Sequence, residues 1–255
     1  MLGPMARRVL VTGGSRGIGL AIVDRLLGRG DVVVASYNRS PGGLEALAQS
    51  HPGRLHAIRA DLAEPPAADA LFSAALVALG GDVDGVVNNA GVMLATPPDA
   101  DPEHWRDSWM RTLQVNLLSA ADLTRCLLLH HAQSATGARR RIVNISSRAA
   151  FRGDGRDAMH YAASKGGLVA LTKSVARGYA EDGVMAFGVA PGWVKTDMAA
   201  EALSEAHRER HLAEIPIGDA APPKEVAVMV ALLLSGEVDH ATGATFDLNG
   251  ASYVR

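Results

Sequence analysis

A phenol and an ammonium group lie four residues apart in the segment Tyr161-Ala162-Ala163-Ser164-Lys165. On a helix this spacing places both side chains on the same face. A free tyrosine has a pKa of about 10 and is a poor base at neutral pH, and we expect the cation of Lys165 to lower that pKa by stabilising the phenolate. A lowered pKa suits Tyr161 to general acid–base catalysis.

A serine hydroxyl supports this interpretation. Ser147 lies fourteen residues before Tyr161, at the end of a segment that begins with the apolar run Ile142–Ile145. Taken alone, the Tyr161–Lys165 spacing is better explained by an exposed tyrosine and lysine that happen to share a helix face. The hydroxyl at the end of a buried strand reverses that preference in favour of a catalytic group.

Glycines cluster after the first apolar run, Val9–Val11, at Gly13, Gly17 and Gly19. Glycine lets the backbone turn sharply and approach a pyrophosphate closely, and a helix that starts here offers free N–H groups and a partial positive charge. An ordinary tight turn is the alternative. The position at the first strand–helix junction of the chain favours a phosphate-binding loop.

Short apolar runs alternate with helical patterns along the whole chain. We predict strands at Val9–Val11, Val32–Ala35, Leu55–Ala60, Gly85–Asn88, Ile142–Ile145, Ala186–Ala190 and Thr245–Leu248. Several of these runs lack polar alternation, which is typical of strands buried on both faces of a parallel sheet. Repeated β–α alternation therefore predicts an α/β fold, a doubly wound parallel sheet with helices on both faces.

The helical patterns have recognisable starts. Asp101-Pro102-Glu103 combines a capping side chain, a proline in the first turn and an acid near the positive dipole end. The pattern after it runs to about Ser134 and is expected to form two helices. Further helices are predicted from Met159 to Ala180 and after Pro222, and no linker divides residues 1–255, so we expect one domain.

Composition narrows the classes of function. The net charge of −2 over 255 residues gives no indication of nucleic acid or an anionic membrane as partner. Cys126 is the only cysteine, so no intrachain disulfide can form, and we expect a reducing, cytoplasmic compartment. No apolar run approaches the roughly 20 residues of a membrane span, and residues 1–8 lack the apolar stretch of a signal peptide. His207 and His211 have metal-ligand spacing, but their charged neighbours favour a solvated helix face, so we predict no metal.

The glycine spacing Thr12-Gly13-x-x-x-Gly17-x-Gly19 resembles that of the short-chain dehydrogenase/reductase family. The likeness extends from residue 8 to residue 250 and is closest to the short, single-domain branch with 3-oxoacyl-[acyl-carrier-protein] reductase-like members. The matching positions are Asp61-Leu62, Asn88-Asn89-Ala90-Gly91, Asn116, Ser147, Tyr161, Lys165 and Pro191-Gly192-Trp193-Val194-Lys195-Thr196.

The resemblance implies a single Rossmann-like domain and an oxidoreductase that transfers a hydride between NADP(H) and a secondary alcohol or ketone, such as a 3-oxoacyl compound. It implies a catalytic tetrad: Ser147 rather than Ser146 polarises the carbonyl, Tyr161 protonates the alkoxide, Lys165 also holds the nicotinamide ribose, and Asn116 holds a relay water through its backbone. The implied cofactor residues are Gly13, Ser15, Arg16, Gly17, Ile18, Gly19, Asn38, Arg39, Ser40, Asp61, Leu62, Asn89, Ala90, Gly91, Tyr161, Lys165, Pro191, Gly192, Val194 and Thr196.

The choice of dinucleotide depends on the end of the second strand. NAD-binding domains usually place an acid there for the ribose 2′-hydroxyl, but Val32–Ala35 runs into Ser36-Tyr37-Asn38-Arg39-Ser40 without one. Arg39 offers a planar fork to a 2′-phosphate, and the family resemblance gives Arg16 the same role. We expect NADP(H) in preference to NAD(H); two merely solvated arginines are the alternative.

Other expectations are broader. The family commonly pairs its long helices across a twofold axis, so a homotetramer is expected, with a small-molecule carbonyl or alcohol substrate and a substrate lid at about 198–214. The segment Arg148–His160 carries unusual charge, which we relate to substrate polarity, and Asp219 replaces a frequent arginine. Two other functions stay open: a non-catalytic dinucleotide-binding protein, and an isomerase or dehydratase that uses the nucleotide transiently.

Overall fold

A parallel seven-stranded sheet with the strand order β3-β2-β1-β4-β5-β6-β7 forms the centre of the protein. The structure is a computed structural model that describes residues 6–134, 137–199, 204, 209 and 212–255. The strands are β1 (Arg8–Val11), β2 (Val32–Tyr37), β3 (Leu55–Arg59), β4 (Gly85–Asn88), β5 (Arg140–Ile145), β6 (Val184–Pro191) and β7 (Thr245–Leu248). The predicted doubly wound α/β fold is confirmed.

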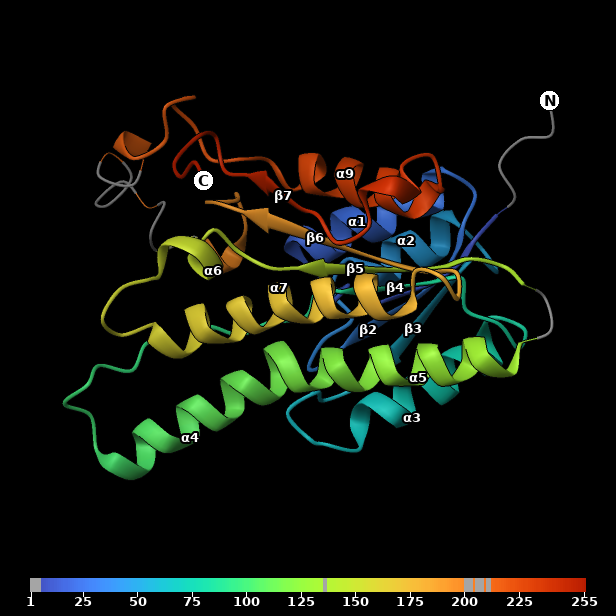
Figure 1. Cartoon of the computed structure of the whole chain (residues 1–255), viewed down its shortest axis with the longest axis horizontal. Coiled ribbons are helices and arrows are strands. Elements are labelled where there is room, and N and C mark those ends of the chain that lie inside the picture. The colour runs from blue at the N-terminus through green and yellow to red at the C-terminus, as the bar shows by residue number, and fades with distance from the viewer. Residues whose placement is uncertain (1–5, 135–136, 200–203, 205–208, 210–211) are drawn as a thin grey trace.

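Helices cover both faces of the sheet (Figure 1). They are α1 (Gly17–Gly28), α2 (Leu44–Ser50), α3 (Ala67–Ala78), α4 (Pro102–Leu113), α5 (Ser119–Gln133), α6 (Ala149–Arg152), α7 (Met159–Tyr179) and α9 (Pro223–Ser235), with a π-helix at Gln114–Leu118 and 3-10 turns at Asp197–Ala199 and Asp239–Ala241. None of the helices in the described residues is long and apolar enough to cross a membrane.

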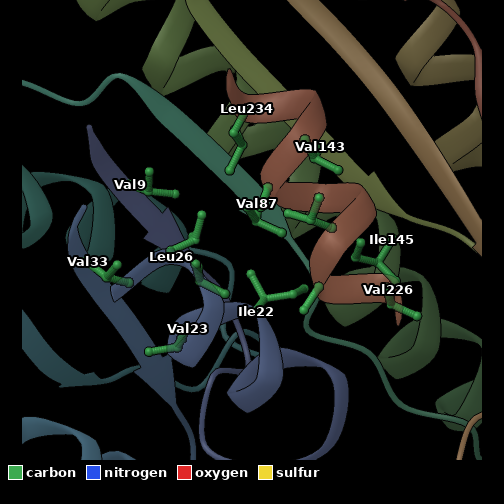
Figure 2. Packing of buried hydrophobic residues seen from close by; sticks show 14 of the residues in the cluster. Val9, Ile22, Val23, Leu26, Val33, Val87, Val143, Ile145, Val226 and Leu234 are labelled. Carbon is green, nitrogen blue, oxygen red and sulfur yellow. The ribbon is translucent and has the colours of Figure 1, made fainter. Parts of the chain in front are cut away.

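Alternate residues of each strand enter two separate cores. Val9 and Val11 of β1 pack with α1 and α9, whereas Leu10 between them packs with α3, α5 and α7. Figure 2 shows the first core, in which Ile22 and Leu26 of α1 meet Val226 and Leu234 of α9. Because successive strand side chains point to opposite faces, such strands are apolar throughout, and this is the pattern from which the sheet was predicted.

Two arginines extend β5 beyond its predicted start. Arg139-Arg140-Arg141 has the sequence of a charged loop, yet Arg140 and Arg141 lie in β5 and are buried. Arg140 donates to Asp84 at 2.9 Å and lies 2.8 Å from Asp82, while Arg141 pairs with Asp239 at 2.9 Å. These ion pairs lie at the amino ends of the strands, at the edge of the sheet opposite to the glycine loop, and allow a charged pair of residues to enter the sheet.

The order in which the chain adds strands to the sheet reverses between β1 and β4. The chain proceeds from β1 outward to β2 and β3, then returns to β4 on the other side of β1. The loops after β1 and β4 therefore leave the carboxyl edge in opposite directions and open a crevice, which is where open α/β sheets bind ligands.

Removing one partner of the buried ion pairs should destabilise the protein. Asp84→Asn deprives the fully buried Arg140 guanidinium of a carboxylate, so we expect the free energy of unfolding in urea to fall by about 3 kcal/mol. Asp69→Asn is the matched control, because Asp69 and Arg125 form an exposed pair that should contribute less than about 1 kcal/mol. Equal losses in the two variants would contradict the assignment.

Candidate active site

The glycine loop, residues 12–19, joins β1 to α1 in a form that side chains would prevent. Gly13 and Gly17 have φ angles of +64° and +56°, a region that favours glycine. A Cβ on Gly19 would lie 2.0 Å from the Gly13 carbonyl oxygen. Among the described residues no side chain caps the start of α1. The bare backbone and the uncapped helix end together fit a pyrophosphate.

Hydrogen bonds fasten the glycine loop to the segment after β4. The Thr12 hydroxyl accepts from the backbone N–H groups of Asn89 and Ala90, each at 3.0 Å. The Asn89 side-chain amide donates in return to the carbonyls of Thr12 and Gly13, at 2.9 and 3.1 Å. The two sides of the crevice are therefore held at one fixed separation.

The segment after β2 packs on the other side of the glycine loop. The Ser15 carbonyl accepts from the N–H of Gly43 at 3.1 Å, and a Cβ on Gly42 would lie 2.6 Å from the same oxygen. Asn38 accepts at its carbonyl from Arg59, Ser40 accepts from Gly42, and Arg39 is exposed. The turn that carries residues 38–40 is thereby brought next to Ser15 and Arg16.

Arg16 makes an exposed ion pair with the loop after β6. Its guanidinium lies 3.5 Å from the carboxylate of Asp197, and both side chains are largely solvated. A contact of this kind is weak, so it does not hold Arg16 away from a phosphate. The segments that carry Arg16 and Arg39 thus lie near each other, and among the described residues the two side chains do not contact each other.

Tyr161 lies near the start of α7 and is close enough to Ser147, two residues after β5, for that hydroxyl to lower the tyrosine pKa. The predicted lowering of the tyrosine pKa is wrong for this structure. Burial raises the pKa of Tyr161 to about 12, and the hydrogen bond from Ser147 offsets this only in part. Desolvation of the phenolate outweighs the stabilising contacts, so Tyr161 is a phenol, a proton donor, at neutral pH.

Lys165 lies one helical turn beyond Tyr161 and is buried. Its ammonium group donates to the Ile145 carbonyl at 2.8 Å and lies 5.8 Å from the centre of the Tyr161 ring. Burial lowers the pKa of Lys165 from 10.5 to about 8. Among the described residues no carboxylate pairs with this cation, which explains why desolvation dominates its pKa.

Asn116 lies in the π-helix between α4 and α5 and is buried rather than exposed. Its side chain accepts from the Val92 N–H at 2.8 Å and donates to the Val92 carbonyl at 2.9 Å. It also donates to the Ser164 hydroxyl at 3.0 Å, which donates to the Tyr161 carbonyl at 2.7 Å. Because the side chain is fully engaged, its role is to fix the segment after β4 against α7, and π-helices of this kind are frequent at functional sites.

Gly91 provides close access to the catalytic groups. A Cβ at this position would lie 3.3 Å from Lys165 Nζ and 3.5 Å from Asn116 Oδ1. The absent side chain leaves the backbone of the crevice wall close to the ammonium group. The loop residues, the crevice wall and Lys165 are therefore arranged as a dinucleotide site requires.

The loop after β6 closes the crevice on its far side. A Cβ on Gly192 would lie 2.9 Å from the Cα of Asn249, and a Cβ on Gly17 would lie 3.1 Å from the Thr196 methyl group. Val194 forms a parallel bridge with Ala221, and Lys195 makes an ion pair with Asp219. The unusual Asp219 thus anchors this loop to the segment that precedes α9.

The remaining predicted site residues lie at the edge of the crevice or outside the described residues. Asp61 and Leu62 follow β3, where Asp61 accepts from the Ala63 N–H at 3.1 Å and Leu62 is buried. Most of the lid predicted at about 198–214 falls outside the described residues, as do His207 and His211. In the part of the chain that the structure describes, no cluster of metal-ligating side chains occurs.

Three residues have contacts at the site that the sequence did not predict for them. Ser164 links Asn116 to Tyr161, and Ser146 donates to the Lys165 carbonyl at 2.9 Å, so both position catalytic residues. Arg148 follows Ser147 directly and is buried. The only sequence signal for them was their proximity to the Tyr161–Lys165 and Ser147 motifs.

Comparison with known proteins agrees with this geometry. Residues 7–207 match the family model described as short chain dehydrogenase. The 3-oxoacyl-[acyl-carrier-protein] reductase FabG of Vibrio cholerae is 35% identical over 248 residues, covering 96% of each protein. The 3beta-hydroxysteroid dehydrogenase 1 of Eggerthella lenta is 33% identical over 259 residues, covering 96% of this chain and 92% of that protein.

A solved structure gives the same result. A short chain dehydrogenase from Burkholderia cenocepacia in complex with NADP superposes with a TM-score of 0.87 at 30% identity, covering 98% of this chain and 99% of that one. Fold, site and relatives define an NAD(P)-dependent oxidoreductase. The chain belongs to the short-chain dehydrogenase/reductase family, as the sequence motifs predicted.

The buried Lys165 should cost stability in the cofactor-free protein. Its pKa of about 8 in the folded state lies below the ordinary 10.5, so the unfolded chain binds more protons between these values and stability rises with pH across that window. Below about pH 8 the cost is fully present. We expect Lys165→Met to raise the free energy of unfolding at pH 7 by on the order of 2 kcal/mol.

Thermal melts of the cofactor-free protein at pH 7 and pH 10 provide the measurement. The difference in Tm between Lys165→Met and the unaltered protein should narrow at pH 10. Lys173→Met, which removes an exposed lysine from the same helix, should leave Tm nearly unchanged at both pH values. A difference in Tm that is the same at pH 7 and pH 10 would refute a buried, destabilising charge at Lys165.

Proposed function

We propose that the protein transfers a hydride between NADP(H) and a secondary alcohol or ketone, with Asn116, Ser147, Tyr161 and Lys165 as its catalytic set. The observation that carries this proposal is the placement of the buried Lys165 ammonium group 5.8 Å from the centre of the Tyr161 ring, with Ser147 close enough to Tyr161 to lower its pKa. Two hydroxyls that meet at the carboxyl edge of the sheet can contact one substrate oxygen. This is the arrangement that a carbonyl reduction requires.

Each residue has a separate task. Ser147 donates a hydrogen bond to the carbonyl oxygen, and Tyr161 delivers its proton to the same oxygen as the negative charge forms there. Because its pKa is raised, Tyr161 is protonated before reaction, which suits reduction. Lys165 places a positive charge within 5.8 Å of the tyrosine ring and stabilises the phenolate that remains. The bound nicotinamide supplies or accepts the hydride.

The same proposal assigns the dinucleotide site. Its residues are Gly13, Ser15, Arg16, Gly17, Ile18, Gly19, Asn38, Arg39, Ser40, Asp61, Leu62, Asn89, Ala90, Gly91, Tyr161, Lys165, Pro191, Gly192, Val194 and Thr196. The turn after β2 has no acid, and the hydrogen bond of Gly43 to the Ser15 carbonyl supports a position of this turn near the start of the Arg16 segment. Two cations at the adenosine end favour the 2′-phosphate of NADP over the hydroxyl of NAD.

The names of the relatives support a small carbonyl substrate and disagree about which one. One is a 3-oxoacyl reductase and another a hydroxysteroid dehydrogenase, so the class of reaction transfers to this chain and the substrate does not. We further infer one domain over residues 1–255, a lid at about 198–214, a cytoplasmic location and a homotetramer. The exposed apolar side chains Met110 of α4, Leu118 of the π-helix and Leu129 of α5 are consistent with such an assembly.

Loss of the proposed proton donor tests the chemistry. Tyr161→Phe keeps the ring and removes the hydroxyl, so we expect kcat for NADPH-dependent ketone reduction to fall at least about a hundredfold. The affinity for NADPH, measured by fluorescence titration, should change little. Tyr179→Phe is the control, because Tyr179 is an exposed tyrosine at the end of the same helix. Near-normal turnover in Tyr161→Phe would overturn the assignment.

A change of charge after β2 tests the choice of cofactor. Arg39→Asp places a carboxylate where we expect the 2′-phosphate, so NADPH affinity should fall at least about tenfold while NADH affinity holds or rises. Isothermal titration calorimetry with both cofactors measures the ratio. Arg25→Asp, an exposed site on α1, controls for total charge. Equal or tighter binding of NADH by the unaltered protein would show the proposal wrong.

A further inference from the structure

Arg148 is a buried arginine whose charge is incompletely paired. Its side chain is 5% exposed, and its Nη2 donates to Glu214 at a long 3.3 Å. Nη1 is buried and has no hydrogen-bond partner among the described residues. A buried guanidinium normally forms two parallel bonds to one carboxylate, so Arg148 retains donor capacity that this contact does not use.

The charges around Arg148 do not balance. Arg152 approaches the same Glu214 carboxylate at 3.9 Å, so two cations share one anion that is itself 43% exposed. Asp154 acts on Arg148 only through space. Burial and the neighbouring Arg152 lower the pKa of Arg148, while Glu214 raises it. An unsatisfied cation of this kind is costly unless a further anion joins it.

The Arg148 side chain lies between the segment of Ser147 and the loop after β6. Arg148 follows Ser147 directly, and consecutive Cα atoms are about 3.8 Å apart. Its guanidinium carbon lies 5.6 Å from the centre of the Trp193 ring, in the loop after β6. Its backbone N–H donates to the Pro191 carbonyl at 2.9 Å, which fixes the start of the side chain. The cation–π contact and the fixed backbone therefore restrict the orientation of the guanidinium.

We propose that Arg148 recognises a carboxylate on the substrate, which makes the substrates of this enzyme short oxo or hydroxy carboxylic acids. The substrate carboxylate displaces the half-exposed Glu214 from Nη2 and pairs with the guanidinium, while Glu214 moves to Arg152. This inference rests on the proposed function, because Ser147 must hold the carbonyl oxygen. Because Arg148 adjoins Ser147 in the chain, we place the carboxylate within one side-chain length of the reacting carbon, which favours short acids over a carrier-bound acyl chain.

Matched substrates separate charge from shape. We would measure kcat/KM with NADPH for 2-, 3- and 4-oxopentanoate, each against its own methyl ester, so that only charge and the carbonyl–carboxylate distance vary. The unaltered protein should prefer at least one acid over its ester. Arg148→Met should reduce kcat/KM for that acid roughly ten- to a hundredfold, the scale of a charged hydrogen bond. The value of kcat/KM for the matching ester should change much less.

Two further variants keep the test decisive if Arg148→Met folds poorly. Glu214→Gln removes the competing carboxylate and should lower KM for the preferred acid without lowering it for the ester. Arg25→Met, an exposed arginine on α1, should leave the preference unchanged. Calorimetric binding of the acid to the Tyr161→Phe variant with NADPH measures recognition without turnover.

The outcomes distinguish the two proposals. Reduction of the esters and acids at equal rates, or an acid preference that survives Arg148→Met, would overturn the role of Arg148 and leave the oxidoreductase proposal intact. Binding of the acid to the Tyr161→Phe variant without any NADPH oxidation by the unaltered protein would overturn the proposed function instead. If the protein neither binds nor reduces any of the three acids, the carboxylate inference is overturned.

Discussion

The Thr12 hydroxyl and the Asn89 side chain fix the distance between the two strands that border the crevice. Their four hydrogen bonds run in both directions between the end of β1 and the end of β4. The glycine loop, α1 and the segment that leads to Gly91 all begin from this junction. If it opened, the glycine-loop backbone and the backbone beside Lys165 would separate, because the pairing of β1 with β4 does not continue beyond this point.

The ionisable groups whose burial is unfavourable for stability lie together at the carboxyl edge of the sheet. Lys165 and Arg148 are buried there and Tyr161 is partly buried, and desolvation is the largest cause of the pKa shift of each group. At the amino edge the buried arginines are paired with carboxylates. The contrast is one of charge: Lys165 and Arg148 lack a full counter-charge at the carboxyl edge, whereas Arg140 and Arg141 are paired with carboxylates at the amino edge.

Local patterns made much of the fold and site predictable. Apolar runs located seven strands, glycine spacing located the phosphate loop, and helical spacing placed Tyr161 and Lys165 on one face. Long-range partners were not predictable in this way. The entry of Arg140 into β5 depends on Asp84, which lies 56 residues away, and the rise of the Tyr161 pKa depends on burial by the whole fold. Likewise the exposed or buried state of Asn116 depends on Val92 and Ser164, which its own helix does not reveal.

The π-helix at Gln114–Leu118 gives the α4–α5 rod one residue more than an α-helix of the same rise would contain, as π-bulges do. Each residue of an α-helix turns the chain by about a hundred degrees, since there are about 3.6 residues per turn. The extra residue therefore sets the phase of α5 relative to α4. A chain without the extra residue would present a different side of α5 to the sheet. Insertions and deletions between α4 and α5 are therefore constrained to preserve the rotation of α5. The number of residues from α4 to α5 thus matters for the active site as well as for the fold.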